Sequence, residues 1–397
     1  MHFKNTYHIS YCTNIHPGEN WETTFISLKD HVPSVKASVA KDQAFGLGLR
    51  LSNTASEELG LGDRLHQFKE WLDNHQLYVF TMNGFPYGNF HKERVKDMVH
   101  APDWTTEERV NYTKRLFRQL AVLSPNDISA GISTSPISYK HWFASENELN
   151  RVCTTGAINM ISVVLELIAI EEATGKSMHL DIEPEPDGIL ENSDEVVHFF
   201  NEYLIPTGVK ILGDKLGKSE EEAKNLVLKY ITVCYDVCHF SLAYEAPEET
   251  IPKLQAAGIG IGKIQVSSAL KILFEEENRE KVWDSLAQFN EPIYLHQVTV
   301  KTDAGVKTYN DLPAVLERKE NFTEIRAHYH VPIFLEQYNE LYATQDQILE
   351  VLAYLKQNKF TDQLEVETYT WDVLPAELKL DIDTSISREI NWLKEQL

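Results

Sequence analysis

The chain has 397 residues, 43% of them hydrophobic and 24% charged, which is the ordinary composition of a globular protein with a sizeable core. Its formal net charge of −23 repels phosphate backbones, so we expect no nucleic-acid partner. We see no apolar stretch near the ~20 residues that cross a bilayer and no secretory signal, and we expect no membrane insertion. The four cysteines are scattered without zinc-ribbon spacing, which favours a reduced, cytoplasmic protein.

Strand-like and helical patterns alternate along the chain. Short apolar segments predict eight strands, at residues 7–13, 45–51, 77–83, 128–134, 178–183, 231–235, 262–267 and 364–369. Apolar residues at helical spacing predict helices at 64–74 (capped by Asp63), 107–123, 158–174, 196–204, 220–229 and 348–358. This alternation predicts an α/β protein, a (β/α)₈ TIM barrel forming a single domain over 1–397. The alternative is a doubly wound open sheet.

One connection is much longer than the others. Residues 268–360 separate the last two strands, and they contain a predicted hairpin formed by 293–300 and 306–309. Long ordered insertions in barrels usually build the lid or wall of the site. We therefore expect this insertion to cover the carboxyl face of the barrel.

The segment Asp236-Val-Cys-His239 follows the sixth strand directly. A carboxylate and an imidazole at the end of a buried strand can both bind a divalent cation. Alternatively, Asp236 caps the next helix and His239 is an ordinary loop histidine. The motif is short, so it decides between these alternatives only together with the other strand ends.

The other predicted strand ends are also polar. Glu183 ends the fifth strand, Gln265 lies on the seventh and Glu367 on the eighth. In a barrel these side chains converge at the carboxyl ends of the strands, and three carboxylates there repel one another unless a cation or protons intervene. With Asp236, this pattern predicts a divalent-metal site in which Glu183 and Glu367 also act as catalytic groups.

Histidines add to the predicted site. His328 and His330 occupy alternate positions of an extended segment, so both rings can point the same way and serve as ligands beside His239. Taken alone, a His-x-His pattern is more often one face of a strand. Other polar and aromatic residues near strand ends or in the insertion are predicted to bind the substrate, and they are His16, Asn83, Tyr87, His91, His296 and Trp371.

These strand ends resemble the xylose-isomerase-like superfamily of TIM barrels, which includes sugar-phosphate isomerases and epimerases and the endonuclease IV fold. The resemblance implies a divalent metal held by Glu183, Asp236 and Glu367. Asp236-Val-Cys-His239 is similar to the Asp-x-x-His of the endonuclease branch, and His328-Tyr-His330 stands near the position of its Asp-x-His. Where the superfamily usually has a histidine on the seventh strand, this chain has Gln265. An amide oxygen favours Mn²⁺ or Mg²⁺ over Zn²⁺.

More narrowly, the chain resembles the EboE metabolite-traffic protein family. The phrases that carry this resemblance are residues 11–19, 79–88, 180–186, 328–332 and 367–371, which run from the first predicted strand to the last. The resemblance implies a link to the export or processing of natural-product precursors. The chemistry of that family is not settled.

Three functions remain open on the sequence. The first is a metal-dependent isomerase or epimerase of a small polyhydroxylated metabolite. The second is a metallohydrolase of a phosphoester, favoured by the number of histidines. The third is a non-enzymatic carrier or scaffold that keeps the barrel pocket for a hydrophobic metabolite. The sequence sets neither the substrate nor the oligomeric state.

Overall fold

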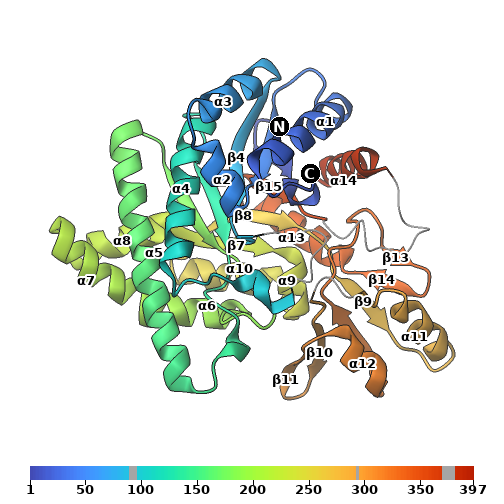
Figure 1. The fold of residues 1–397 in the computed structure, drawn as a ribbon. Helices are drawn as coiled ribbons and strands as arrows, with labels where there is room; N and C mark the ends of the chain where they lie inside the picture. Colours follow the sequence, from blue (N-terminus) through green and yellow to red (C-terminus); the bar gives the residue numbers. More distant parts are fainter. Residues whose placement is uncertain (89–95, 292–294, 369–380) are drawn as a thin grey trace.

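The computed structural model describes residues 1–88, 96–291, 295–368 and 381–397 (Figure 1). Eight parallel strands lie at its centre, and they pair in the order β2-β15-β8-β7-β6-β5-β4-β3. Their bounds are β2 Tyr7–Tyr11, β3 Phe45–Arg50, β4 Leu77–Asn83, β5 Ala130–Thr134, β6 Met178–Ile182, β7 Ile231–Asp236, β8 Ile261–Val266 and β15 Gln363–Val366. A short strand β1 (His2–Phe3) adds to β2 in the antiparallel sense.

The sheet curves round until its two edge strands meet. A parallel bridge joins Cys12, just after β2, to Gly48 of β3. Nearby, the Arg50 backbone N–H donates to Thr13 Oγ1 over 2.9 Å. These contacts make a nearly closed barrel, so the predicted (β/α)₈ architecture is confirmed and the open sheet is excluded.

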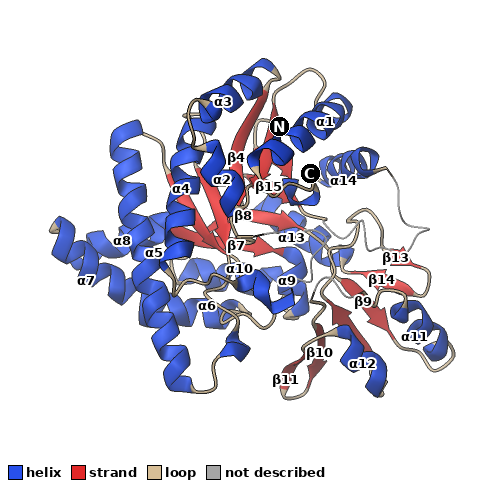
Figure 2. Ribbon diagram, in the orientation of Figure 1, coloured by secondary structure: helices blue, strands red, loops and turns tan. Residues whose placement is uncertain are grey.

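Helices surround the barrel strands (Figure 2). Their bounds are α1 Trp21–Val39, α2 Asn53–Leu59, α3 Arg64–Asn74, α4 Glu107–Leu123, α5 Glu146–Thr174, α6 Ser193–Phe199, α7 Ile205–Leu216, α8 Glu220–Tyr230, α9 Val237–Leu242, α10 Pro247–Ala256, α13 Gln345–Gln357 and α14 Ile382–Gln396. The short 3-10 helices η1 Thr13–Ile15, η2 Lys96–His100 and η3 Lys140–Trp142 and the π-helical turn η4 Phe200–Leu204 lie in the connections.

Three local expectations differ from the structure. Asp63 precedes α3 but its side chain makes no capping bond, because its backbone (φ −101°, ψ 10°) lies outside the extended region that cap residues use. Helix α5 starts at Glu146, twelve residues before its predicted start, since Ser145 and Glu148 form a capping box there. Strand β15 ends at Val366, which leaves Glu367 just past the strand.

The connection between β8 and β15 forms a second sheet beside the barrel, at the lower right of Figure 1. Its strands pair in the order β11-β10-β12-β9-β14-β13. The bounds of its elements are β9 Leu270–Leu273, β10 Val298–Thr302, β11 Gly305–Tyr309, β12 Glu324–Ala327, β13 Gln337–Tyr338, β14 Leu341–Ala343, α11 Arg279–Ala287 and α12 Leu312–Arg318. The predicted hairpin is present as β10 and β11, although Ile293 and Tyr294 lie outside the described residues.

The inside of the barrel is polar as well as apolar. Lys263 of β8 donates to Glu365 of β15, and both side chains are fully buried. Gly48 faces this pair, and a Cβ at that position would lie 1.5 Å from Glu365 Oε1. A glycine is therefore required at this point of β3, because only a residue without a side chain leaves room for the Glu365 carboxylate.

Helix α5 is long enough and apolar enough to cross a membrane, by length and composition alone. Its mean hydropathy is 1.8 over an 18-residue window. Half of that window is buried inside the protein. The buried side includes Met160, Val163, Val164 and Leu167. A core helix of a globular protein has this character, and no other helix in the described ranges has it.

Candidate metal centre

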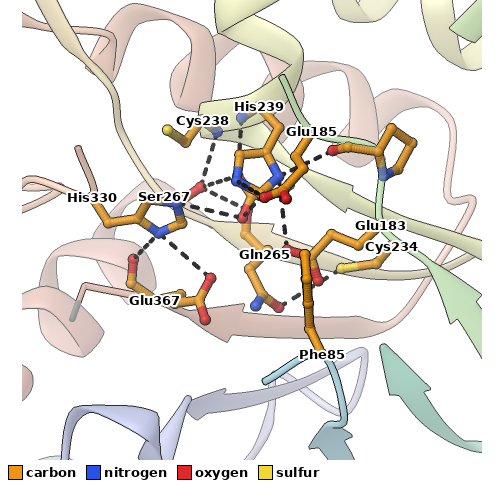
Figure 3. A network of polar contacts seen from close by, with 12 residues as sticks. Phe85, Glu183, Glu185, Cys234, Cys238, His239, Gln265, Ser267, His330 and Glu367 are labelled. Atoms are coloured by element: carbon orange, nitrogen blue, oxygen red, sulfur yellow. Dashed lines mark hydrogen bonds and ion pairs between the residues drawn. The ribbon is translucent and has the colours of Figure 1, made fainter. Parts of the chain in front are cut away.

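Three carboxylates meet at the carboxyl ends of the barrel strands, and Figure 3 labels two of them, Glu183 and Glu367. Glu183 follows β6, Asp236 ends β7 and Glu367 follows β15, and each offers an oxygen within 4.8 Å of the other two. Within the part of the chain that the structure describes, Glu183 Oε2 and Asp236 Oδ2 are buried without a hydrogen-bond partner. Burial, and then the charges of Glu367 and Asp236, raise the pKa of Glu183 well above its usual range. A cation among these oxygens would remove the repulsion.

Asp236 is both a helix cap and a candidate ligand. Its Oδ1 accepts the His239 backbone N–H over 3.1 Å at the start of α9, and it accepts Ser267 Oγ–H over 2.7 Å. These bonds use one oxygen and fix the orientation of the carboxylate. The other oxygen, Oδ2, is thereby directed toward the His239 and His330 rings, 4.0 Å from a nitrogen of each. The predicted capping role of Asp236 is confirmed, His239 lies in α9 rather than in a loop, and the role of both residues as metal ligands stays a prediction.

Three histidines lie beside the carboxylates. His239 comes from α9, while His328 and His330 follow β12 of the second sheet. Ring centroids of His239 lie 4.8 Å from His328 and 5.5 Å from His330. The intervening Tyr329 points away and stacks on His296, as alternation along an extended segment requires.

The hydrogen bonds of these rings define which nitrogen carries the proton. His239 Nδ1 lies 3.0 Å from the Pro184 carbonyl oxygen, which only accepts, so Nδ1 is the donor. Gln297 Nε2 donates to the Pro186 carbonyl, which turns Gln297 Oε1 toward His328 Nδ1 at 2.8 Å and makes that nitrogen a donor too. His330 Nδ1 likewise donates to the Glu367 carbonyl over 3.2 Å.

Each ring is therefore held through Nδ1 and directs Nε2 inward, the arrangement that orients metal-binding histidines. The clearest sign is the contact between His239 Nε2 and His328 Nε2, which are 3.1 Å apart. Burial, followed by the neighbouring imidazoles, lowers the pKa of His328 well below its usual range. Two neutral rings with these tautomers would point lone pairs at each other here, and a cation or a shared proton between them would relieve that repulsion.

Further polar residues complete the site, and of these Asn83 was predicted from the sequence whereas Asn14, Glu185 and His100 were not. Asn14 Nδ2 donates to Glu367 Oε1 over 2.7 Å, and Asn83 Nδ2 donates to the same oxygen over 3.0 Å. Glu185 lies 4.0 Å from His239 Nε2 and pairs with His100 at 2.8 Å. The Pro-rich loop after β6 and the position of Asn14 after β2 were the available signals for Glu185 and Asn14.

A cavity of about 70 Å³ opens onto this cluster. Its polar lining includes Glu183, Glu367, Asn83 and the His328 and His330 rings, and its apolar lining consists of Phe85, Pro86, Val99 and Leu295. Lys96 lies at the cavity and forms an ion pair with Asp311 at 2.5 Å. The volume suits an ion with a few water-sized groups.

Several predicted binding residues do not line this cavity. His16 bonds to Tyr11 Oη over 2.8 Å and stacks on His31, and His296 bonds to the His328 carbonyl and to Glu291. Tyr87 packs on Tyr112 instead. His91 and Trp371 lie outside the described residues.

Gln265 is buried and in register with Asp236. Its Oε1 accepts from Cys234 Sγ at 3.8 Å, and Nε2 has no hydrogen-bond partner within the described ranges. Rotation of the amide by a half-turn would exchange the two atoms. Gln265 as a metal ligand therefore stays a prediction.

No protein-family model matches the chain, and no curated protein does. Solved structures that are similar include a D-tagatose 3-epimerase-like protein (12% identity, TM-score 0.47, covering 98% of this chain and 96% of that one). Another is an IolI protein with a bound zinc atom (12% identity, TM-score 0.44, covering 98% of this chain and 95% of that one). A third is a xylose isomerase-like TIM barrel protein from Mycobacterium smegmatis in complex with magnesium (9% identity, TM-score 0.49, covering 100% of this chain and 98% of that one). Similarity at this level says nothing about the chemistry of this chain.

Proposed function

We propose that this protein is a divalent-metal enzyme that isomerises or epimerises a small polyhydroxylated metabolite. One observation carries the proposal. The inward Nε2 atoms of His239, His328 and His330 and the unpartnered oxygens of Glu183 and Asp236 belong to one buried cluster beside a cavity. Among the described residues, the two buried carboxylate oxygens of Glu183 and Asp236 have no hydrogen-bond partner, and leaving them so is costly unless a ligand satisfies them.

Glu183 and Glu367 are two of the three carboxylates that line the cavity, the third being Glu185. Glu367 is fixed by Asn14 and Asn83, so it suits a ligand that keeps its orientation. Glu183 has one oxygen without a partner, so it suits a base that takes a proton from a carbon next to a substrate carbonyl. In an isomerisation Glu183 then returns the proton to the neighbouring carbon, whereas in an epimerisation Glu183 keeps it and a second acid, for which Glu367 is the candidate, would deliver a proton to the opposite face of the same carbon. A bound cation would stabilise negative charge on the substrate oxygens during this transfer.

We also propose that the chain is related to the EboE family. The phrases similar to the EboE family include residues 180–186 and 328–332, which carry Glu183, Glu185 and both insertion histidines. We propose on this basis a small metabolite of natural-product synthesis as the substrate and a single domain in the cytoplasm as the working form.

Metal content tests the proposal first. Elemental analysis of purified protein, after dialysis against Mn²⁺, Mg²⁺ or Zn²⁺, should give at least one ion per chain. Asp236→Asn is the sharpest variant, because the amide oxygen can keep both Oδ1 bonds while the unpartnered Oδ2 is replaced. It should lose most of the metal and remain folded. Asp103→Asn, a buried aspartate that bonds to Thr105 and Ser138 instead, should keep the metal.

Proton exchange tests the chemistry. Protein loaded with Mn²⁺ or Mg²⁺ should wash solvent deuterium into the carbon next to the carbonyl of a ketose in a panel followed by NMR. Glu183→Gln should lower the exchange rate by about 10²–10⁴-fold, which is the usual contribution of a general base. Metal binding without exchange on any member of the panel would contradict the isomerase and favour the hydrolase or the carrier.

A phosphoester hydrolase is the second candidate, and the imidazole cluster favours it. His239, His328 and His330 supply nitrogen ligands suited to Zn²⁺, and with the carboxylates they leave room for more than one ion. A Zn²⁺-loaded protein with two or more ions per chain that hydrolyses a phosphomonoester or phosphodiester would establish it. A protein that binds no metal but retains an apolar ligand in the cavity would establish the carrier.

A further inference from the structure

Glu389 is a buried carboxylate on the last helix, α14, outside the barrel. Only 1% of its surface is exposed, although α14 packs on the outer helix α1 and shows charged residues to solvent. Its Oε1 accepts two hydrogen bonds, from Thr368 Oγ1 at 2.6 Å and from the Ile333 backbone N–H at 3.1 Å. Burial of a carboxyl group is unfavourable unless such hydrogen bonds compensate for the lost contact with water.

The two donors belong to the two segments that carry metal-site residues. Thr368 is the residue after Glu367, at the end of β15. Ile333 comes three residues after His330, on the segment that leads away from the second sheet. These segments are far apart in sequence, and Glu389 is hydrogen-bonded to both of them.

The segments also touch each other at the site. His330 Nδ1 donates to the Glu367 carbonyl and lies 3.4 Å from Glu367 Oε2. On its other side the 332–333 segment is bonded by Tyr338 Oη and by Gln345 Nε2, both from the second half of the insertion. Those bonds join the 332–333 segment to other residues of the insertion. Among the bonds described here, those made by Glu389 and His330 join residues 330–333 to the segment after β15 that carries Glu367.

We propose that Glu389 is a positioning residue for the metal centre, setting the separation of Glu367 and His330 by bonding to Thr368 and Ile333. The inference rests on the metal binding proposed above and adds a residue that touches neither metal nor substrate. Outer partners of this kind typically change metal affinity by about 10–100-fold when they are removed.

The test compares four variants by Co²⁺ titration, following both the dissociation constant and the visible absorption bands that report ligand geometry. Glu389→Leu removes the acceptor and should weaken Co²⁺ binding by about 10–100-fold and shift the bands. Glu389→Gln keeps an acceptor oxygen and should stay within about threefold of wild type with the same bands. Thr368→Val removes one donor and should give an intermediate loss.

The matched control is Ile390→Ala, the neighbouring residue on α14, which is fully buried in the apolar core. It should lower the unfolding temperature like Glu389→Leu and leave the Co²⁺ dissociation constant and bands unchanged. If Glu389→Leu does not fold, the comparison of Thr368→Val with Ile390→Ala carries the test alone.

The outcomes separate the two proposals. Wild-type protein that binds no Co²⁺ overturns the metal centre, and the role of Glu389 with it. Wild-type binding that is unaffected in Glu389→Leu and Thr368→Val overturns only the role of Glu389. An affinity loss in Ile390→Ala as large as in Glu389→Leu also overturns it, because α14 would then act through general stability.

Discussion

Single residues of this protein often serve stability and the candidate site together. Lys263 is the clearest case, since it is the buried partner of Glu365 below the carboxylate cluster. Burial opposes its charge, but Glu365 together with Cys234, Cys12 and Glu183 more than offsets this and raises the pKa of Lys263 above its usual value. The positive charge also lies near enough to Glu183 to oppose the rise in the pKa of that group.

We predict that Lys263→Met destabilises the protein by about 3–5 kcal/mol, because it leaves the Glu365 charge buried and unpaired. The double variant Lys263→Met/Glu365→Leu should recover much of that loss, since it removes both charges. Urea unfolding of wild type, Lys263→Met, Glu365→Leu and the double variant measures this. A double variant as unstable as the sum of the two single variants would show that the pair is not coupled.

Glu389 provides a second prediction at this scale. Burial raises the pKa of Glu389 from its ordinary value of 4.5 to about 8, and the bonds from Thr368 and Ile333 offset this only partly. A carboxyl with a raised folded-state pKa stabilises the fold fully below about pH 4.5, and this contribution declines as pH rises toward 8. Glu389→Gln cannot ionise, so its unfolding temperature relative to wild type should rise between pH 5 and pH 8.5. A constant difference over that range would contradict the shifted pKa.

At the scale of elements, helix boundaries follow local hydrogen bonds more closely than apolar spacing. Ser145 accepts from the Glu148 backbone N–H, and the Glu148 carboxylate accepts in return from the Ser145 N–H. These bonds start α5 well before its apolar face becomes regular. The Ala144 backbone N–H and then the Ser145 hydroxyl, which also donate to the Glu148 carboxylate, lower the pKa of Glu148.

The observed cap Ser145 and the expected cap Asp63 supply a matched pair of variants. Ser145→Ala should destabilise the protein by about 1 kcal/mol, the usual cost of losing a helix cap. Asp63→Ala should change the free energy of unfolding by less than about 0.5 kcal/mol, since Asp63 makes no capping bond and is exposed. Denaturant unfolding of both variants measures the difference, and equal effects would mean that the cap geometry does not set the energy.

At the scale of the whole molecule, the net charge determines how strongly the protein attracts charged partners. A net charge of −23 leaves little non-specific attraction for a polyanion. We predict no binding of duplex DNA at micromolar protein in about 0.15 M salt. A gel-shift titration checks this, and a shifted band at that concentration would restore a nucleic-acid substrate to the hydrolase candidate.

The amino-acid sequence by itself determined the barrel. Apolar runs such as 231–235, alternating with helical spacing, have few other ways to bury their surface than a closed parallel sheet. It also determined that Glu183, Asp236 and Glu367 gather at one end, because strand ends of a parallel barrel lie on the same face. The placement of Gln265 beside Asp236 followed in the same way from register.

Only the tertiary structure decided how the other groups join them. His328 and His330 come from a second sheet whose position relative to the barrel depends on long-range pairing, which local patterns do not contain. The same holds for Asn14 and Glu389, whose partners lie 353 and 21 residues away in the chain. Side-chain hydrogen bonds across such distances are set by packing of whole elements, and local periodicity carries no information about them.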